Sequence, residues 1–177
     1  MKTFLSIIED APQIVKDKLE QLKSLRERPD YHPEPSTFHH IEIVTNRLIP
    51  TGDMDLILSG ILHDICKLDT AKMNEKTGWP TSPGHDQAAF DLIFSSLSIK
   101  DWIRDNGGDE VNVALICKGH MRFHQLGDMR PFKREDQIQE WTDLGIFDKL
   151  QIFGAADNMI EPFDLTNLEK SWKWKNK

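Results

Sequence analysis

Apolar residues recur at every third or fourth position along most of the chain, which is the spacing of a helix with one buried face. The segment from Met54 to about Ile65 is apolar on nearly every side, so it is predicted to be the central buried helix. No two alternating segments flank a tight turn, and no β-hairpin is predicted. The predicted helices cover residues 12–28, 36–49, 54–65 and 147–160, and two more open at Gly84-His85 and at Asp109-Glu110.

Prolines and glycines separate these helices. Residues 29–35 hold three prolines and are predicted to be a loop. Residues 67–83 and 127–135 are irregular, and we expect them to shape a functional pocket, as long loops in compact domains often do. The prediction is an all-α, compact, single-domain helical bundle. Its predicted parts are an N-terminal helical segment packing on the domain (1–30), the core (31–160) and a short C-terminal helix and tail (161–177).

The length and charge of the chain limit its number of domains and the kind of partner that it binds. A chain of 177 residues fits one domain, and its net charge of −7 argues against a strong, sequence-independent grip on nucleic acid. A small phosphorylated molecule such as a nucleotide is the expected partner, and nucleic acid is the less favoured one. The two cysteines are too few for a disulfide framework and suit a reducing cytosol.

Signals for secretion or membrane insertion are not found. Residues 1–10 have neither the basic start nor the long apolar stretch of a signal peptide. No window approaches the roughly 18 apolar residues that a spanning helix needs. We therefore expect a cytoplasmic protein with no membrane partner, and the sequence leaves its oligomeric state open.

Histidine and aspartate residues occur in an order that suits a metal site. Imidazole and carboxylate are favoured ligands of divalent Zn, Mn, Fe, Co and Ni. Asp64 follows a buried apolar run, where an uncompensated carboxylate is costly and a metal bound by several histidines would compensate it. Each residue taken singly fits an ordinary core or surface position, and only the ordered set indicates metal-assisted hydrolysis. The candidate ligands are His40, His63, Asp64, His85, His120 and Asp157.

The short motifs around these residues resemble the HD-domain metal-dependent phosphohydrolases. The stretch from Tyr31 to His40 is most similar to the HD domain attached to bacterial tRNA nucleotidyltransferases. The resemblance covers Tyr31 to Asp157, and it is specific for the superfamily without naming a substrate. The motifs are His40, Gly60–Lys67 with its His-Asp pair, Pro83-Gly84-His85, Gly119–His124 and Ala156-Asp157.

One position and one missing segment depart from the family pattern, and the identity of the first ligand is ambiguous. Cys66 stands where the family commonly has glycine, which we expect to be tolerated because Lys67 remains. The 30 residues before the motif are too few for a nucleotidyltransferase head, so addition of nucleotides to tRNA is not expected. His39 and His40 compete as first ligand, and His40 is preferred because Val44 then falls on the core side, as in the family.

The resemblance implies a metal-dependent phosphodiesterase or phosphatase. One or two divalent ions (Mn, Ni, Co, Zn, Mg or Fe) bind, and a metal-activated water attacks phosphorus in line. The implied catalytic residues are Asp64, Lys67 and His120. The first ion is held by His40, His63, Asp64 and Asp157, and Asp64 bridges to a second held by His85 and His120, with His124 nearby.

Substrate contacts are assigned to cations and polar residues near the motifs. Lys67 is the main candidate for a phosphate oxygen, as in the family. His32 and Glu34 either orient substrate or cap a loop. The Trp/Lys tail over 170–175 either stacks on bases or packs as a final helix. The further substrate-binding candidates are Arg122, His124, Lys118 and Arg130.

Two other functions compete with hydrolysis. Some HD-type proteins with this histidine-rich set bind two irons and oxidise a small phosphonate or polyol with O₂. Tyr31 and Glu34 resemble the lid of a phosphonate-cleaving oxygenase of this type, but the loop shared with the nucleotidyltransferase group favours hydrolysis. A non-catalytic nucleotide-binding sensor is the third hypothesis, and the complete ligand set argues against it.

Overall fold

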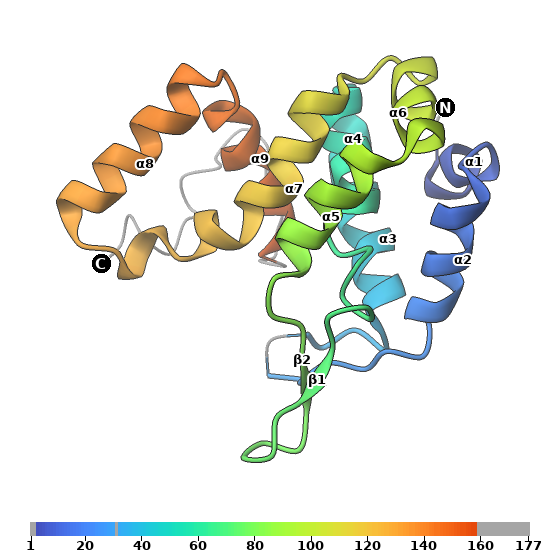
Figure 1. The fold of residues 1–177 in the computed structure, drawn as a ribbon, viewed down its shortest axis with the longest axis horizontal. Coiled ribbons are helices and arrows are strands. Elements are labelled where there is room, and N and C mark those ends of the chain that lie inside the picture. Colours follow the sequence, from blue (N-terminus) through green and yellow to red (C-terminus); the bar gives the residue numbers. More distant parts are fainter. Residues whose placement is uncertain (1–2, 31, 159–177) are drawn as a thin grey trace.

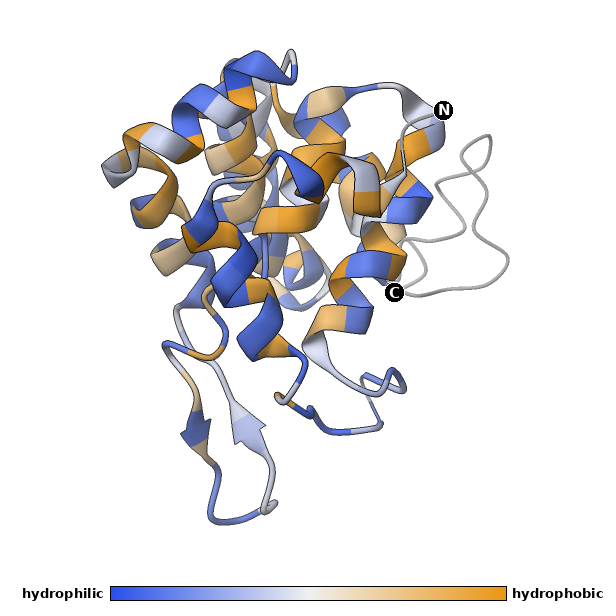
Figure 2. Ribbon diagram, turned by 90° about the vertical axis from the view of Figure 1, so that its right-hand side faces the viewer, coloured by the Kyte–Doolittle hydropathy of each residue, from blue (hydrophilic) through white to orange (hydrophobic). Residues whose placement is uncertain are grey.

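Helix α4 (Met54–Leu62) lies at the centre of the fold, as its apolar sequence predicted. Every residue from Asp55 onward in this helix is buried. The helix packs against α3 (Thr37–Leu48), α7 (Glu110–His124) and α9 (Phe147–Asp157), which surround it in Figure 1. In Figure 2 hydrophobic and hydrophilic positions alternate along the helices, as expected of helices with one buried face. Each large aliphatic side chain buried here stabilises the fold by about 1.5–3 kcal/mol.

The computed structural model describes residues 3–30 and 32–158. Regular structure in this part is almost all helical, which confirms the predicted all-α class and compact single bundle. Tyr31 and the predicted C-terminal helix and tail lie outside the described residues. Among the described residues, no helix is long and apolar enough to cross a membrane. The other elements are α1 (Phe4–Glu9), α2 (Gln13–Leu22), η1 (Ile49–Thr51), β1 (Lys72–Met73), β2 (Pro80–Thr81), α5 (His85–Ser95), α6 (Leu97–Asp105), η2 (Leu126–Asp128) and α8 (Pro131–Asp143).

The prediction of no hairpin was wrong in one detail. Strands β1 and β2 pair antiparallel, with Lys72 opposite Thr81 and Met73 opposite Pro80. Two residues a strand are too few to give the alternating pattern by which sequence signals a hairpin. The hairpin projects away from the helices at the bottom of Figures 1 and 2.

Two helix boundaries also differ from the prediction. The helix expected over 12–28 ends at Leu22, and the extra helix α1 precedes it. Helix α8 begins at Pro131, inside the stretch 127–135 that was predicted to be irregular. Proline suits the first turn of a helix because its ring already holds a helical φ angle and its missing N–H is not needed there.

Aspartate side chains cap two of the helices. The Asp53 side chain accepts hydrogen bonds from backbone amides at the start of α4, and Asp109 does the same for α7. Ser36 stands at the N-cap of α3, but its hydroxyl contacts His39 Nδ1 at 2.8 Å instead of the helix backbone. This contact holds the His39 ring at the helix start.

The N-terminal helices belong to the same core as α4. Phe4 and Ile7 of α1 and Val15, Leu19 and Leu22 of α2 are buried in one continuous apolar cluster with the central helices. Both helices contact α3. The first part of the chain is therefore packed against the helix that carries His40.

Gly154 allows α9 to approach α7 closely. An added Cβ at this position would lie 2.4 Å from Phe123 Cδ1 and Cε1, and Phe123 is fully buried. We expect Gly154→Ala to lower the free energy of unfolding by about 1–3 kcal/mol, the usual cost of overpacking. Urea denaturation measures this loss.

Gly119→Ala is the matched comparison for that variant. Its added Cβ would meet the Leu150 methyl groups at 3.1 Å, which is a milder contact, so a smaller loss of stability is expected. Equal stability of Gly154→Ala and the unmodified chain would contradict the close approach of α7 and α9.

Asp55 ties three helices together at the end of the bundle opposite the hairpin. Its carboxylate accepts hydrogen bonds from the Asp109 amide at 2.7 Å, Asn112 Nδ2 at 2.9 Å and Lys149 Nζ at 2.9 Å. Burial alone would raise the pKa of Asp55, but the Asp109 amide and Lys149 hold it below the usual 3.8. Because the folded-state pKa is the lower one, this stabilisation is complete above pH 3.8 and is lost as pH falls through the folded value.

Asp55→Asn is therefore expected to destabilise the fold in a pH-dependent way. Near pH 7 the loss is about 2 kcal/mol, the size of hydrogen bonds to a charged group. The difference from the unmodified chain should shrink as pH falls below 3.8. Urea unfolding across pH 2.5–7 measures it, with the exposed Asp101→Asn as control. A difference that does not change with pH would refute the role of the Asp55 charge.

Candidate metal centre

The fold brings the predicted ligands from five helical elements to one place. His40 lies on α3, His63 and Asp64 directly follow α4, and His85 opens α5. His120 lies on α7 and Asp157 ends α9. The four histidines and Asp64 are each at most 4% exposed, and the Asp157 side chain is 8% exposed. The region is therefore shielded from bulk water.

The first group of ligand atoms comes from His40, His63 and Asp157. One nitrogen or oxygen of each lies within 4.8 Å of the others, a spacing that can hold a metal ion. His40 Nε2 is 2.8 Å from Asp157 Oδ1, and His63 Nε2 is 3.6 Å from the same oxygen.

The second group comes from Asp64, His85 and His120 and meets the same spacing. Asp64 Oδ1 is 3.1 Å from His85 Nε2 and 3.7 Å from His120 Nε2. The two imidazole Nε2 atoms are 3.2 Å apart.

Asp64 connects the two groups. Its other oxygen, Oδ2, lies 3.2 Å from His63 Nε2 and 3.7 Å from His40 Nε2 in the first group. One carboxylate therefore presents each of its oxygens to a different set of imidazole nitrogens.

Each of the four histidines uses Nδ1 to contact an oxygen outside the two groups. An imidazole that donates from Nδ1 carries its lone pair on Nε2 when it is neutral, so this arrangement fixes the tautomer that binds a metal through Nε2. The contacts are His63 with the Gly60 carbonyl at 3.0 Å, His85 with the Ser82 carbonyl at 2.6 Å, His120 with the Cys117 carbonyl at 2.5 Å and His40 with Glu34 Oε1 at 2.9 Å.

Unpartnered atoms at the centre also fit a metal ion. His63 Nε2 and Asp64 Oδ1 are buried and make no well-oriented hydrogen bond among the described residues. The facing nitrogens of His85 and His120 would repel each other as two lone pairs without a cation or proton between them. A divalent ion in the first group would satisfy His63 Nε2, and one in the second group would satisfy Asp64 Oδ1, His85 Nε2 and His120 Nε2.

Electrostatics favour ionised carboxylates at this centre. Burial alone would raise the pKa of Asp64, but nearby His63 and Lys67 hold it well below its usual value. Burial likewise opposes ionisation of Asp157, and hydrogen bonds from His124 and His40 reverse that effect on its pKa. Both carboxylates are therefore charged at neutral pH, as metal ligands must be.

The histidines differ in protonation. Burial and nearby His63 lower the pKa of His120 to about 3, so its ring is neutral. Burial alone would lower the pKa of His40, but hydrogen bonds to Asp157 and Glu34 raise it to about 10. A proton and a metal ion consequently compete for His40 Nε2.

Lys67 is locked between two carboxylates. Its ammonium lies 2.9 Å from Asp64 Oδ2 and 2.9 Å from each Glu27 oxygen. Burial alone would lower the pKa of Lys67, but the charges of Asp64 and Glu27 raise it, so the side chain stays cationic. Glu27 was missed from the sequence because its partner is 40 positions away, and a charged residue in a charged segment gives no local signal.

His124 supports Asp157. It lies four residues beyond His120 on the same helix, and its Nε2 donates to Asp157 Oδ2 at 2.6 Å. This contact fixes the carboxylate oxygen that does not face His40. Helix α7 continues through Gly119, so His120 and His124 share one face.

Three predicted substrate-binding cations are not brought to the histidine cluster. Lys118 and Arg122 line a separate hollow of about 180 Å³ between α7 and α8. The Lys118 ammonium lies 4.7 Å from the centre of the Phe90 ring. Arg130 is exposed at the start of α8. Lys118 and Arg122 lie two residues before and two residues after His120. Both therefore point to the opposite side of the helix, which explains why neither reaches the cluster.

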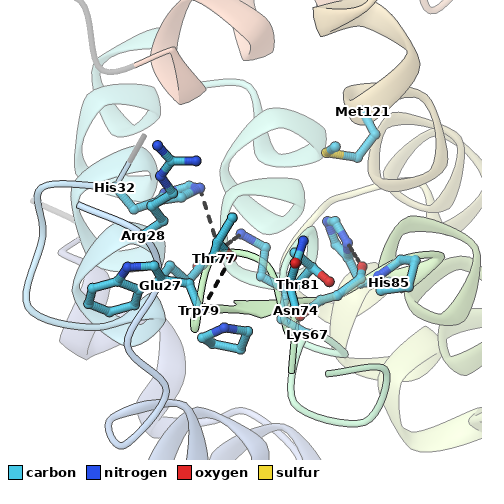
Figure 3. A pocket seen from close by; sticks show the side chains of 13 residues that line it. Glu27, Arg28, His32, Lys67, Asn74, Thr77, Trp79, Thr81, His85 and Met121 are labelled. Atoms are coloured by element: carbon cyan, nitrogen blue, oxygen red, sulfur yellow. Dashed lines mark hydrogen bonds and ion pairs between the residues drawn. The ribbon is translucent and has the colours of Figure 1, made fainter. Parts of the chain in front are cut away.

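A pocket of about 400 Å³ opens beside the cluster. Figure 3 shows Glu27, Arg28 and His32 on one side of it and His85 and Met121 on the other. The loop over 67–83 contributes much of its lining, as predicted, whereas none of residues 127–135 lines it.

Comparison with known proteins finds distant relatives. The chain is 29% identical over 127 residues to the multifunctional CCA protein of Xylella fastidiosa (strain M12), and 27% identical over 128 residues to that of Xanthomonas axonopodis pv. citri (strain 306). Each alignment covers 68% of this chain and only 28% of the relative. The chain is a distant relative of these proteins. This supports the predicted link to the tRNA nucleotidyltransferase group. No protein-family model matches the sequence, and no solved structure does.

Proposed function

We propose that this chain is a metal-dependent phosphohydrolase acting on nucleotides or nucleic-acid ends. The observation that carries the proposal is Asp64, whose two oxygens face two separate groups of imidazole nitrogens. Two-metal hydrolases use a shared carboxylate of this kind. The distant likeness to the multifunctional CCA proteins supports a substrate that contains a nucleotide.

The donor atoms suit one or two divalent ions. We assign His40, His63, Asp64 and Asp157 to the first ion, and Asp64, His85 and His120 to the second. A bound divalent ion lowers the pKa of coordinated water and neutralises charge on phosphoryl oxygens. Nitrogen and carboxylate ligands suit Mn, Ni, Co, Zn or Fe, and Mg is the least expected at a histidine-rich site.

The remaining residues hold this centre in place. Glu34 orients the His40 ring, and His124 orients Asp157, through the hydrogen bonds described above. Lys67 keeps Asp64 ionised and presents a positive charge at the floor of the pocket. A phosphate entering the pocket would meet Lys67 on the side now occupied by Glu27, so it would share the ammonium with that carboxylate.

A hydrolysis panel tests the proposal. Protein stripped of metal is supplied in turn with Mn, Ni, Co, Zn or Mg and assayed on nucleoside 2′,3′-cyclic phosphates, nucleoside monophosphates, triphosphates and short oligonucleotides. We expect metal-dependent release of phosphate or ring opening by the unmodified chain and none by Asp64→Ala. Circular dichroism should show that the helical content of the variant is retained.

Other outcomes favour the two competing functions. Substrate-dependent O₂ uptake by iron-loaded protein, without hydrolysis by any metal form, would replace the proposal with a di-iron oxygenase. Nucleotide binding with neither hydrolysis nor O₂ uptake would replace it with a non-catalytic sensor. Hydrolysis with Mn or Ni in the absence of O₂ would exclude both.

A further inference from the structure

The pocket beside the histidine cluster has an aromatic wall. Trp79 is half-buried and lines the same cavity as Lys67 and His85. Those two side chains reach the cluster directly, because both lie close to Asp64, at 2.9 Å and 3.1 Å. Figure 3 shows the Trp79 side chain at the edge of the pocket, with His85 across from it. One cavity therefore extends from the candidate metal centre to an indole ring.

The turn of the hairpin holds Trp79 in position. The Asn74 carbonyl accepts hydrogen bonds from the amides of Thr77 and Gly78 at 3.2 and 2.8 Å, and the Asn74 amide donates to the Trp79 carbonyl at 3.0 Å. Gly78 has a φ of 70°, a left-handed conformation that suits glycine. The backbone on both sides of the indole is thus tied to one residue.

Two polar side chains of this turn each accept a hydrogen bond from its backbone. Asn74 Oδ1 accepts from the Lys76 amide at 3.0 Å, and Thr77 Oγ1 accepts from the Trp79 amide at 3.4 Å. Arg28, on the same side of the pocket as Trp79, is paired with Asp30 at 2.5 Å. A ligand in this part of the pocket would meet the Trp79 side chain and the rings of Pro80 and Pro83.

The chemistry at the two ends of the cavity defines the ligand. One end has the ligands and the lysine that suit a phosphoryl group, and the other has a flat aromatic surface. A volume of about 400 Å³ suits a small molecule rather than a long chain. A phosphate ester that carries a flat aromatic base suits both ends of the cavity. Every base can stack on an aromatic side chain, regardless of which hydrogen-bonding groups the base carries.

We propose that Trp79 is the base-stacking residue of this site and determines its preference for nucleotides over phosphate esters without a base. The position of the phosphate in this scheme rests on the proposed function. Since stacking requires only a flat ring, it selects for the presence of a base and discriminates little among the four bases.

Equilibrium binding tests this role without requiring turnover. Metal-loaded protein is titrated by calorimetry with cytidine monophosphate, adenosine monophosphate and ribose 5-phosphate. The unmodified chain should bind both nucleotides more tightly than ribose 5-phosphate. Trp79→Ala should reduce that preference by about tenfold or more, the effect of losing one base–aromatic stack. Trp79→Phe should restore most of it, because phenylalanine also stacks.

The control is Phe132→Ala, which removes an exposed aromatic side chain from α8 and should leave the preference unchanged. An equal preference in Trp79→Ala and the unmodified chain would overturn the inference, even if the protein hydrolyses nucleotides. A preference that depends on Trp79 in a protein that hydrolyses nothing would sustain the inference and overturn the proposed function instead. Trp79 lies outside the buried core, so the variants should fold, as circular dichroism can verify.

Discussion

Asp64→Asn is expected to reduce metal-dependent hydrolysis by about a thousandfold and to lower the number of bound ions. Asparagine keeps the size of the side chain but removes the charge that faces both groups of imidazole nitrogens. Metal ions supply several kcal/mol of transition-state stabilisation, and about 4 kcal/mol corresponds to this factor. Metal content by plasma emission spectroscopy and steady-state turnover measure the two effects.

Asp91→Asn is the matched control for that experiment. Asp91 is an exposed aspartate on α5, the helix that also carries His85, and its loss should change neither metal content nor turnover. Asp64→Asn protein that kept the metal content and activity of the unmodified chain would refute the assignment of Asp64 as the shared ligand.

Glu27→Gln is expected to have the largest effect on stability among the variants considered. The Lys67 ammonium is almost completely buried and makes two of its 2.9 Å contacts with this carboxylate. Breaking a buried ion pair leaves a charge without its partner and typically costs 3–5 kcal/mol. Because Glu27 is 15% exposed and Asp64 still pairs with Lys67, we expect a loss of about 3 kcal/mol. Urea unfolding of the metal-free protein measures it.

A double variant separates this pair from a general packing defect. Adding Lys67→Met to Glu27→Gln removes the stranded charge, so the double variant should be more stable than the sum of the single changes implies. Glu20→Gln, at an exposed glutamate that pairs with Lys23, should leave stability unchanged. Additive effects of the two substitutions would contradict a direct Glu27–Lys67 interaction.

The sequence by itself determined the helical class and the position of the central helix. Both depend on local signals: the apolar run over 54–62 can only be buried, and Asp53 and Asp109 cap helices through atoms two or three residues away. The candidate ligands were also visible, because a buried aspartate beside a histidine needs a partner. The sequence could also have predicted that His124 reaches the site and that Lys118 and Arg122 do not. His124 is four residues from His120, on the same side of the helix, whereas the other two are two residues away, on the opposite side.

Only the tertiary structure decided how these residues meet. The opposed oxygens of Asp64, the Glu27–Lys67 pair and the place of Trp79 beside His85 each join segments that are far apart along the chain or separated by an irregular loop. No periodicity encodes such contacts, because they depend on how α3, α4, α5, α7 and α9 pack around one point. The sequence gives the chemical type of each side chain, but the distances between the side chains are set by how the helices pack.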